Sequence, residues 1–93
     1  MATAVFRYQT KPEAADENQR LIEKVFAELT SATPPALTYA SFRLADGVTF
    51  VHVVDGEGLT DLAAFQEFQQ ALSDRLDGDL TREEATRIGV FPS

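Results

Sequence analysis

A group of polar side chains near the middle of the chain has the types and spacing that acid–base chemistry requires. His52 is the only histidine, and histidine is the side chain whose ordinary pKa lies closest to neutrality. Tyr39 and Arg43 lie in a β-prone stretch just before it, where alternate side chains share one face. On such a face His52 can act as a general base, Tyr39 can donate to a developing negative charge, and Arg43 can hold an acidic group.

Two more residues of this stretch complete the candidate site. Ser41 lies between Tyr39 and Arg43, and Phe50 shares the alternation of His52, so both are candidates for contacting a ligand. A simpler interpretation stays open, in which His52 is a half-buried strand residue bonded to Ser41 and Arg43 pairs with a carboxylate of a partner subunit. Residue pattern alone favours this simpler interpretation.

Other kinds of site lack the residues that they need. Zinc takes three or four ligands from His, Cys or carboxylates, and one histidine without any cysteine does not provide them. Gly56 and Gly58 are a fragment of a glycine-rich loop without a following Lys, and no G-x-S-x-G motif occurs. We therefore expect no metal, no nucleotide and no other cofactor.

The segment from Leu37 to Asp55 predicts the hairpin that would position the candidate site. Two runs rich in β-branched and aromatic residues flank Asp46-Gly47, a pair typical of a two-residue type I′ turn. The turn also sets the strand register. The predicted pairs are Ala40 with Val53, Phe42 with Val51 and Leu44 with Thr49 on one face, and Tyr39 with Val54, Ser41 with His52 and Arg43 with Phe50 on the other.

Both faces of this hairpin carry large apolar side chains, whereas a hairpin with one solvated face alternates apolar and polar residues. The face with Phe42 and Val51 is the more uniformly apolar, and we expect the helices to cover it. The face with Tyr39, Phe50 and His52 then stays open in a monomer. A two-fold homodimer that presses these faces together would bury it.

The remaining segments predict two helices and two further strands. Residues 3–9 form a β-prone run, and apolar residues recur at helical spacing from Leu21 to Leu29. A second helix is expected from about Leu62 to Leu76, with Phe65 and Phe68 in its apolar stripe. We interpret this stripe as core rather than as an aromatic ligand pocket. The last strand is expected at 85–91, after a turn.

This order of elements predicts an α+β protein of the ferredoxin-like βαββαβ type. Two right-handed crossovers give a four-stranded antiparallel sheet with both helices on one face. Residues 1–93 are expected to form a single domain.

Charge and composition exclude several classes of partner. The net charge is −7, and no cluster of Lys and Arg is available for a phosphate backbone. The acids concentrate between Asp55 and Glu84, which we interpret as a solvated helix face and loop. The first residues do not resemble a signal peptide, and no apolar run has the ~18–20 residues that span a membrane. We expect a cytoplasmic protein that binds neither nucleic acid nor membranes.

The order of elements, the length of 93 residues and the two-sided hairpin resemble the dimeric α+β barrel proteins. Within them, the antibiotic-biosynthesis monooxygenase-like group is the most similar. The resemblance covers nearly the whole chain and is one of topology, without a diagnostic motif. It implies that two subunits join their sheets into a barrel with a pocket beside each sheet. Members of the superfamily include cofactor-free monooxygenases, haem-degrading enzymes and small-molecule isomerases.

The chain departs from that group in the residues that carry its chemistry. The cofactor-free monooxygenases rely on Trp, Asn and Tyr in the pocket, whereas this chain has no Trp, and its one Asn, Asn18, lies near the start of the first predicted helix. The haem-degrading members use a helix-borne His, whereas His52 lies on a strand. We therefore expect a homodimer that binds a small molecule beside the sheet without the usual oxygenase residues. The alternative is a cofactor-free monooxygenase-like or isomerase-like enzyme acting on a small aromatic or oxygenated metabolite.

Overall fold

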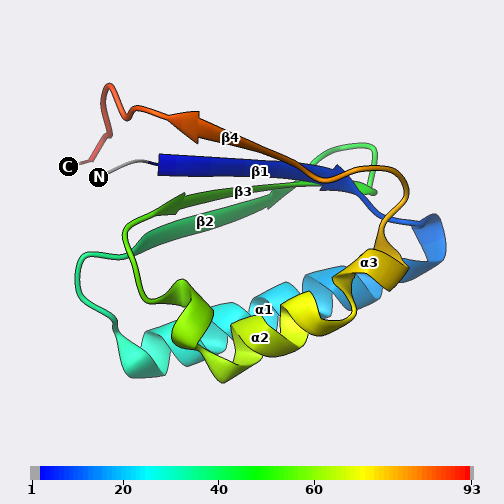
Figure 1. The fold of residues 1–93 in the computed structure, drawn as a ribbon, viewed down its shortest axis with the longest axis horizontal. Coiled ribbons are helices and arrows are strands. Elements are labelled where there is room, and N and C mark those ends of the chain that lie inside the picture. Colours follow the sequence, from blue (N-terminus) through cyan, green and yellow to red (C-terminus); the bar gives the residue numbers. More distant parts are fainter. Residues whose placement is uncertain (1–2, 93) are drawn as a thin grey trace.

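A four-stranded antiparallel sheet with all its helices on one face makes up the computed structural model, which describes residues 3–92 (Figure 1). The strands lie in the order β2-β3-β1-β4, with the bounds β1 (Thr3–Gln9), β2 (Thr38–Arg43), β3 (Thr49–Asp55) and β4 (Thr81–Ala85). The helices are α1 (Ala15–Ala32), α2 (Ala63–Gln70) and α3 (Leu72–Arg75), with short 3-10 turns η1 (Pro12–Ala14) and η2 (Leu59–Asp61). The predicted ferredoxin-like fold is confirmed.

The register predicted for the hairpin of β2 and β3 is also confirmed. Tyr39 pairs with Val54, Ser41 with His52 and Arg43 with Phe50. Strand β1 then pairs with the other edge of β3, so that the three strands β2, β3 and β1 lie side by side.

The turn that sets this register differs from the predicted type I′ turn. The Leu44 N–H donates to the Thr49 carbonyl, so four residues rather than two connect the strands. Gly47 is the one residue of this loop with positive φ, at 79°. Asp46 instead caps the turn, because its carboxylate accepts hydrogen bonds from the Val48 and Thr49 N–H groups. The register survives because the longer loop is still centred on Asp46-Gly47.

The helices cover the opposite face of the hairpin from the one predicted. Tyr8, Phe50 and His52 are buried beneath them, whereas Phe42 is 53% exposed. The prediction weighed how uniformly apolar each face is, but a polar ring can be buried at little cost when its nitrogens have hydrogen-bond partners. We call the uncovered side, with Val5, Ala40, Phe42, Val51 and Val53, the open face.

The second helix and the last strand differ from their predicted bounds. A break at Ala71, where φ is −121° and ψ is 24°, divides the helix into α2 and α3. The last strand is Thr81–Ala85 and not 85–91, so the segment interpreted as a turn is the strand. Its sequence, TREEA, is polar because β4 is an edge strand, and charged residues are typical of sheet edges.

Within residues 3–92, every helix is too short or too polar to cross a lipid bilayer.

Replacing Gly47 by Val should destabilise the fold by roughly 1–2 kcal/mol, because a side chain in the left-handed region meets its own backbone. The open space around Gly47 leaves this conformational strain as the cause. Gly89→Val is the matched control, since Gly89 also has open space around it and lies outside the left-handed region. Urea unfolding measures both variants, and equal stabilities would contradict the observed turn.

Candidate functional site

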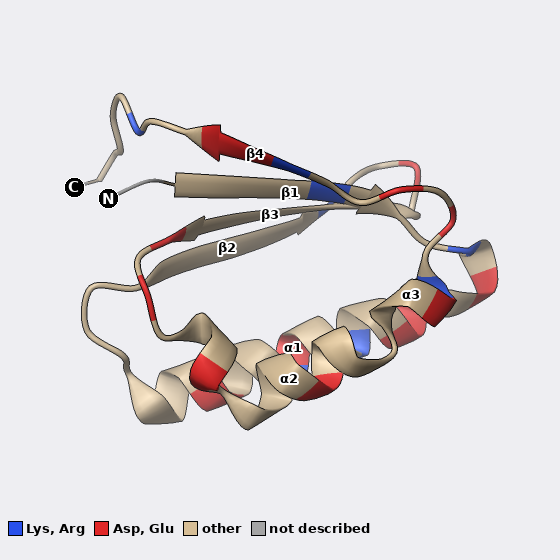
Figure 2. Cartoon of the chain, in the orientation of Figure 1, with Lys and Arg blue, Asp and Glu red and all other residues tan. Residues whose placement is uncertain are grey.

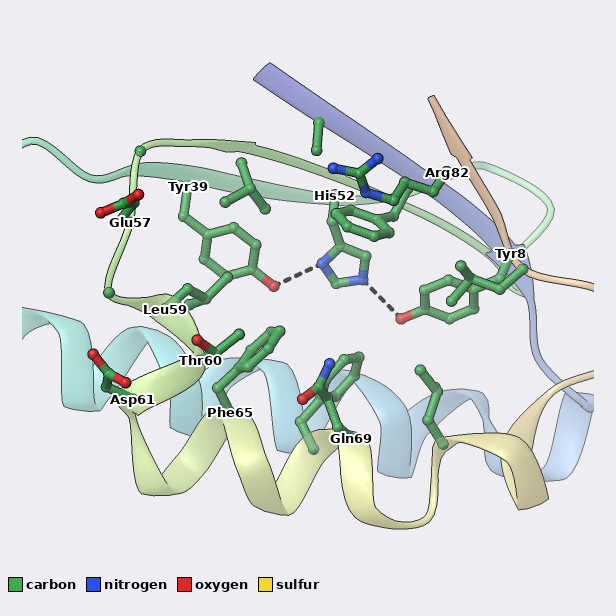
Figure 3. Close-up of a pocket in the computed structure, with 18 residues that line it drawn as sticks. Tyr8, Tyr39, His52, Glu57, Leu59, Thr60, Asp61, Phe65, Gln69 and Arg82 are labelled. Carbon is green, nitrogen blue, oxygen red and sulfur yellow. Dashed lines mark hydrogen bonds between the residues drawn. The ribbon is translucent and has the colours of Figure 1, made fainter. Parts of the chain in front are cut away.

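A cavity of about 680 Å³ lies between the helix-covered face of the sheet and α2 (Figure 3). This volume is within the range of small-molecule sites, roughly 300–1,000 Å³. The apolar part of its lining comes from strands β1 and β3, from η2 and from α2 and α3, and includes Phe6, Val54, Leu59, Phe65, Phe68 and Leu72. Glu57, Asp61 and Arg82 add charged groups to the same lining.

One wall of the cavity carries three polar rings in a row, Tyr39, His52 and Tyr8 (Figure 3). The Tyr8 hydroxyl lies 2.7 Å from His52 Nε2, and the Tyr39 hydroxyl lies 2.7 Å from His52 Nδ1. The rings are nearly parallel, with interplanar angles of 14° and 9° to the imidazole. They line up because β1, β3 and β2 are neighbours and each strand contributes one ring.

A second row of polar groups lies behind Tyr8. Asn18 is fully buried on α1 and donates from Nδ2 to the Tyr8 hydroxyl over 3.0 Å. Arg75, at the end of α3, donates from Nε to Asn18 Oδ1 over 2.9 Å and from Nη2 to the Phe68 carbonyl over 2.6 Å. The guanidinium also lies over the Phe68 ring, 5.3 Å from its centre. An unbroken chain of polar contacts therefore runs from Arg75 to the cavity wall.

Burial sets the charge of this network at neutral pH. It lowers the pKa of His52 to about 4, because the imidazolium would lose its hydration. Burial also raises the pKa of Tyr39 to about 12, although the Ser41 hydroxyl opposes the shift. The pKa of Tyr8 is raised by burial too, against the hydrogen bond from Asn18. All three rings are therefore uncharged at pH 7.

The structure brings three of the five predicted site residues together. Tyr39 and His52 line the cavity, and the Ser41 hydroxyl lies 2.7 Å from His52 Nδ1. Arg43 and Phe50 instead border a separate groove and do not line the cavity.

Arg43 is held on the surface by its own chain. Its Nη1 donates to Asp16 over 3.1 Å and to Gln19 over 2.7 Å, and its guanidinium lies 5.6 Å from the centre of the Phe50 ring. The carboxylate that pairs with Arg43 in the structure thus comes from α1 of the same chain. Phe50 is a core residue, 1% exposed and stacked on Tyr8.

Sequence reasoning missed Tyr8, Asn18 and Arg75. Asn18 lies near the start of α1, as the sequence indicated, and its side chain reaches the Tyr8 hydroxyl. Its spacing to Leu21, Ile22 and Val25, all buried, places it on the core-facing stripe of α1. A lone amide on an apolar stripe is the signal that could have identified it. Arg75 gives no such signal, because charged residues are common at helix ends.

The chain resembles known proteins in its fold and not in its sequence. No protein-family model matches the sequence, and no curated protein matches it. Among solved structures, an antibiotic biosynthesis monooxygenase aligns with a TM-score of 0.74 at 16% identity, covering 96% of this chain and 100% of its own. Rv0793 from Mycobacterium tuberculosis gives 0.75 at 10% identity, covering 97% of each chain.

A third neighbour is a variant of SnoaB, described as a cofactor-independent oxygenase from Streptomyces nogalater. It aligns with a TM-score of 0.67 at 16% identity and covers 99% of this chain and 97% of its own. The resemblance to antibiotic biosynthesis monooxygenase-like proteins is therefore confirmed for the fold. Identities this low do not carry over an activity.

The stability of the protein should fall as the pH drops below the ordinary pKa of histidine, about 6.5. The unfolded chain binds a proton there, whereas folded His52 stays neutral until about pH 4. The free energy that neutral His52 contributes to stability is therefore complete above about pH 6.5. It is lost as the pH falls towards the pKa of His52 in the folded state. Linkage gives a loss of about 1.4 kcal/mol between about pH 7.5 and about pH 5.5.

Urea unfolding at these two pH values tests the expectation. His52 is the only histidine, so His52→Gln should remove most of the slope. A variant that keeps the full slope would show that another group titrates in this range.

Proposed function

We propose that this protein is a homodimer that binds a small, mainly apolar molecule bearing oxygen in the cavity between the sheet and α2. One observation carries the proposal: the cavity, about 680 Å³ in volume, combines aromatic walls with the polar row Tyr8–His52–Tyr39. Polar groups placed against apolar walls are typical of ligand sites, where the polar groups fix the orientation of the ligand. A cytoplasmic location remains a prediction from the sequence.

A cofactor-free enzyme of the monooxygenase or isomerase kind is the second candidate. It is favoured by the phenolic hydroxyls at both nitrogens of His52, since such a row can move protons. The pKa of His52, about 4, argues against it. A general base works best when its pKa is near the working pH, and this imidazole is a weak base at pH 7.

The residues of the cavity support binding over oxygenation. The chain has no Trp, and Asn18, although close to the site, contacts Tyr8 from behind and is not among the lining residues. No residue of this cavity therefore matches the Trp and Asn that the resemblance associates with oxygenase chemistry.

The apolar side chains on the open face of the sheet support the homodimer. The open face presents Phe42, 53% exposed, among aliphatic residues, and Figure 2 shows few charged residues along the middle of β1, β2 and β3. The segment after β4, beyond the opposite edge of the sheet from β2, also exposes Ile88 and Phe91, which are 100% and 97% exposed. An exposed apolar patch usually marks an interface, and a second copy of the sheet presents the same apolar side chains to the open face.

2-Acetylnaphthalene is a suitable probe of the cavity, because it is aromatic, uncharged and carries one carbonyl. We expect saturable binding by calorimetry, and loss of binding in Ala4→Trp, whose new ring would fill the cavity from β1. Ala71→Trp adds the same ring at an exposed position outside the lining and should leave binding unchanged. Equal binding by both variants would place the site elsewhere.

The same probe separates binding from catalysis. The protons next to its carbonyl exchange with D₂O through an enol, and NMR follows that exchange. We expect binding without acceleration. Exchange that is faster with the protein, and that is lost in His52→Gln, would favour the enzyme instead.

Light scattering after size exclusion should report twice the chain mass of 10.2 kDa. Phe42→Arg should produce a monomer, because the charge would be desolvated in the interface without a partner. Gln70→Arg, at an exposed position on α2, is the control and should remain dimeric. The sequence pattern placed Phe50 on the face expected to form the interface, but Phe50 is a core residue, and its substitution would disturb folding. A monomeric wild-type chain would contradict the homodimer.

A further inference from the structure

The hydrogen bonds behind the cavity run in one direction from donor to acceptor, and Arg75 fixes that direction. Arg75 can only donate hydrogen bonds, so the Asn18 atom that it contacts must be the carbonyl oxygen, as observed at 2.9 Å. The amide nitrogen of Asn18 therefore faces Tyr8 and donates to its hydroxyl oxygen. Arg75 is 7% exposed, and within residues 3–92 no carboxylate lies at ion-pair distance from it.

The same order of donor and acceptor continues from Tyr8 to His52. A phenol has one proton, and the Tyr8 oxygen accepts from Asn18 on one side. We infer that its proton points to the other side, where His52 Nε2 lies at 2.7 Å. Nε2 is then an acceptor. A neutral imidazole has one N–H, so this direction puts the ring proton of His52 on Nδ1.

At Nδ1 the chain reaches the cavity. His52 Nδ1 lies 2.7 Å from the hydroxyl oxygens of both Tyr39 and Ser41, and with its proton on Nδ1 the imidazole donates to them. Ser41 is not part of the cavity lining, whereas Tyr39 is. The Tyr39 ring is held between neighbours, stacked on Phe26 at 4.9 Å and edge-on to Phe65 at 6.5 Å. Its hydroxyl proton is the last donor of the chain.

We propose that the chain from Arg75 through Asn18, Tyr8 and His52 orients Tyr39 as a fixed hydrogen-bond donor, which selects ligands with a carbonyl oxygen at that point of the cavity. Tyr39 would touch the ligand, and Arg75 and Asn18 would act as positioning residues. Hydrogen bonds aligned in one direction polarise one another, so the buried cation strengthens the last donor. The proposal rests on the proposed function, because it needs a small molecule in the cavity.

The protonation of His52 tests the direction without any ligand. Because His52 is the only histidine, a ¹⁵N NMR spectrum of the untagged chain shows one pair of ring nitrogens. We expect the proton on Nδ1 in the wild type. Asn18→Asp should move it to Nε2, because the new carboxylate accepts from both Arg75 and Tyr8 and so reverses the chain.

Gln69→Glu is the matched control for that variant. It makes the same change from amide to carboxylate on the cavity lining, away from the polar chain, and should leave the proton on Nδ1. A purely structural role of Asn18 would leave the protonated nitrogen unchanged in both variants. A proton on Nε2 in the wild type would overturn the proposal.

A pair of ligands tests the donor itself. 2-Acetylnaphthalene and 2-ethylnaphthalene differ in the carbonyl oxygen, so we expect the ketone to bind roughly 3–10-fold more tightly, the effect of one net hydrogen bond. Tyr39→Phe and Asn18→Asp should each remove this preference while the hydrocarbon binds as before.

The outcomes of this ligand test separate the two proposals. A preference that survives in Tyr39→Phe would overturn the role of Tyr39 and leave the cavity as a binding site. If neither compound binds, the proposed function fails and the use of Tyr39 fails with it, while the NMR result still decides the direction of the chain.

Discussion

The hydrogen bonding of one buried imidazole makes it possible for the helices to cover the face of the sheet that carries it. An imidazole removed from water with unpaired nitrogens would cost several kcal/mol, yet His52 is 4% exposed. Tyr8 and Tyr39 satisfy both nitrogens from the two flanking strands. Because this cost is met inside the sheet, the helices can cover the face that carries His52. The hydrogen bonds of His52 therefore account both for the burial of this face of the sheet and for the polar wall of the cavity.

A second buried group satisfies a carbonyl at the break between α2 and α3. A helix that ends leaves its last carbonyls without partners in the next turn. Arg75 donates to one of them, on Phe68, and also to Asn18 on α1. The buried guanidinium thus joins three helices by hydrogen bonds. This arrangement resolves the usual difficulty of a charged group in the interior, because its donors are directed to carbonyl oxygens.

The solved neighbours place the fold in a group that includes described oxygenases, and the cavity shows why that likeness is limited to the fold. One scaffold supports different chemistries when its lining residues change. Here the lining combines phenylalanines with a neutral Tyr–His–Tyr row. A row of uncharged rings of this kind is better suited to orienting a molecule than to removing a proton from it.

Local patterns in the sequence determined the order of elements, the hairpin register and the presence of Tyr39, Ser41 and His52 on one face. These features depend on alternation and on a turn centred on Asp46-Gly47, which neighbouring residues specify by themselves. The tertiary structure decided the rest: which face is covered, where the polar strand β4 pairs, and how Asn18 and Arg75 reach Tyr8. Arg75 and Asn18 are 57 positions apart, and a contact of that kind is set by helix packing and by the need to satisfy buried polar groups, neither of which a local pattern contains.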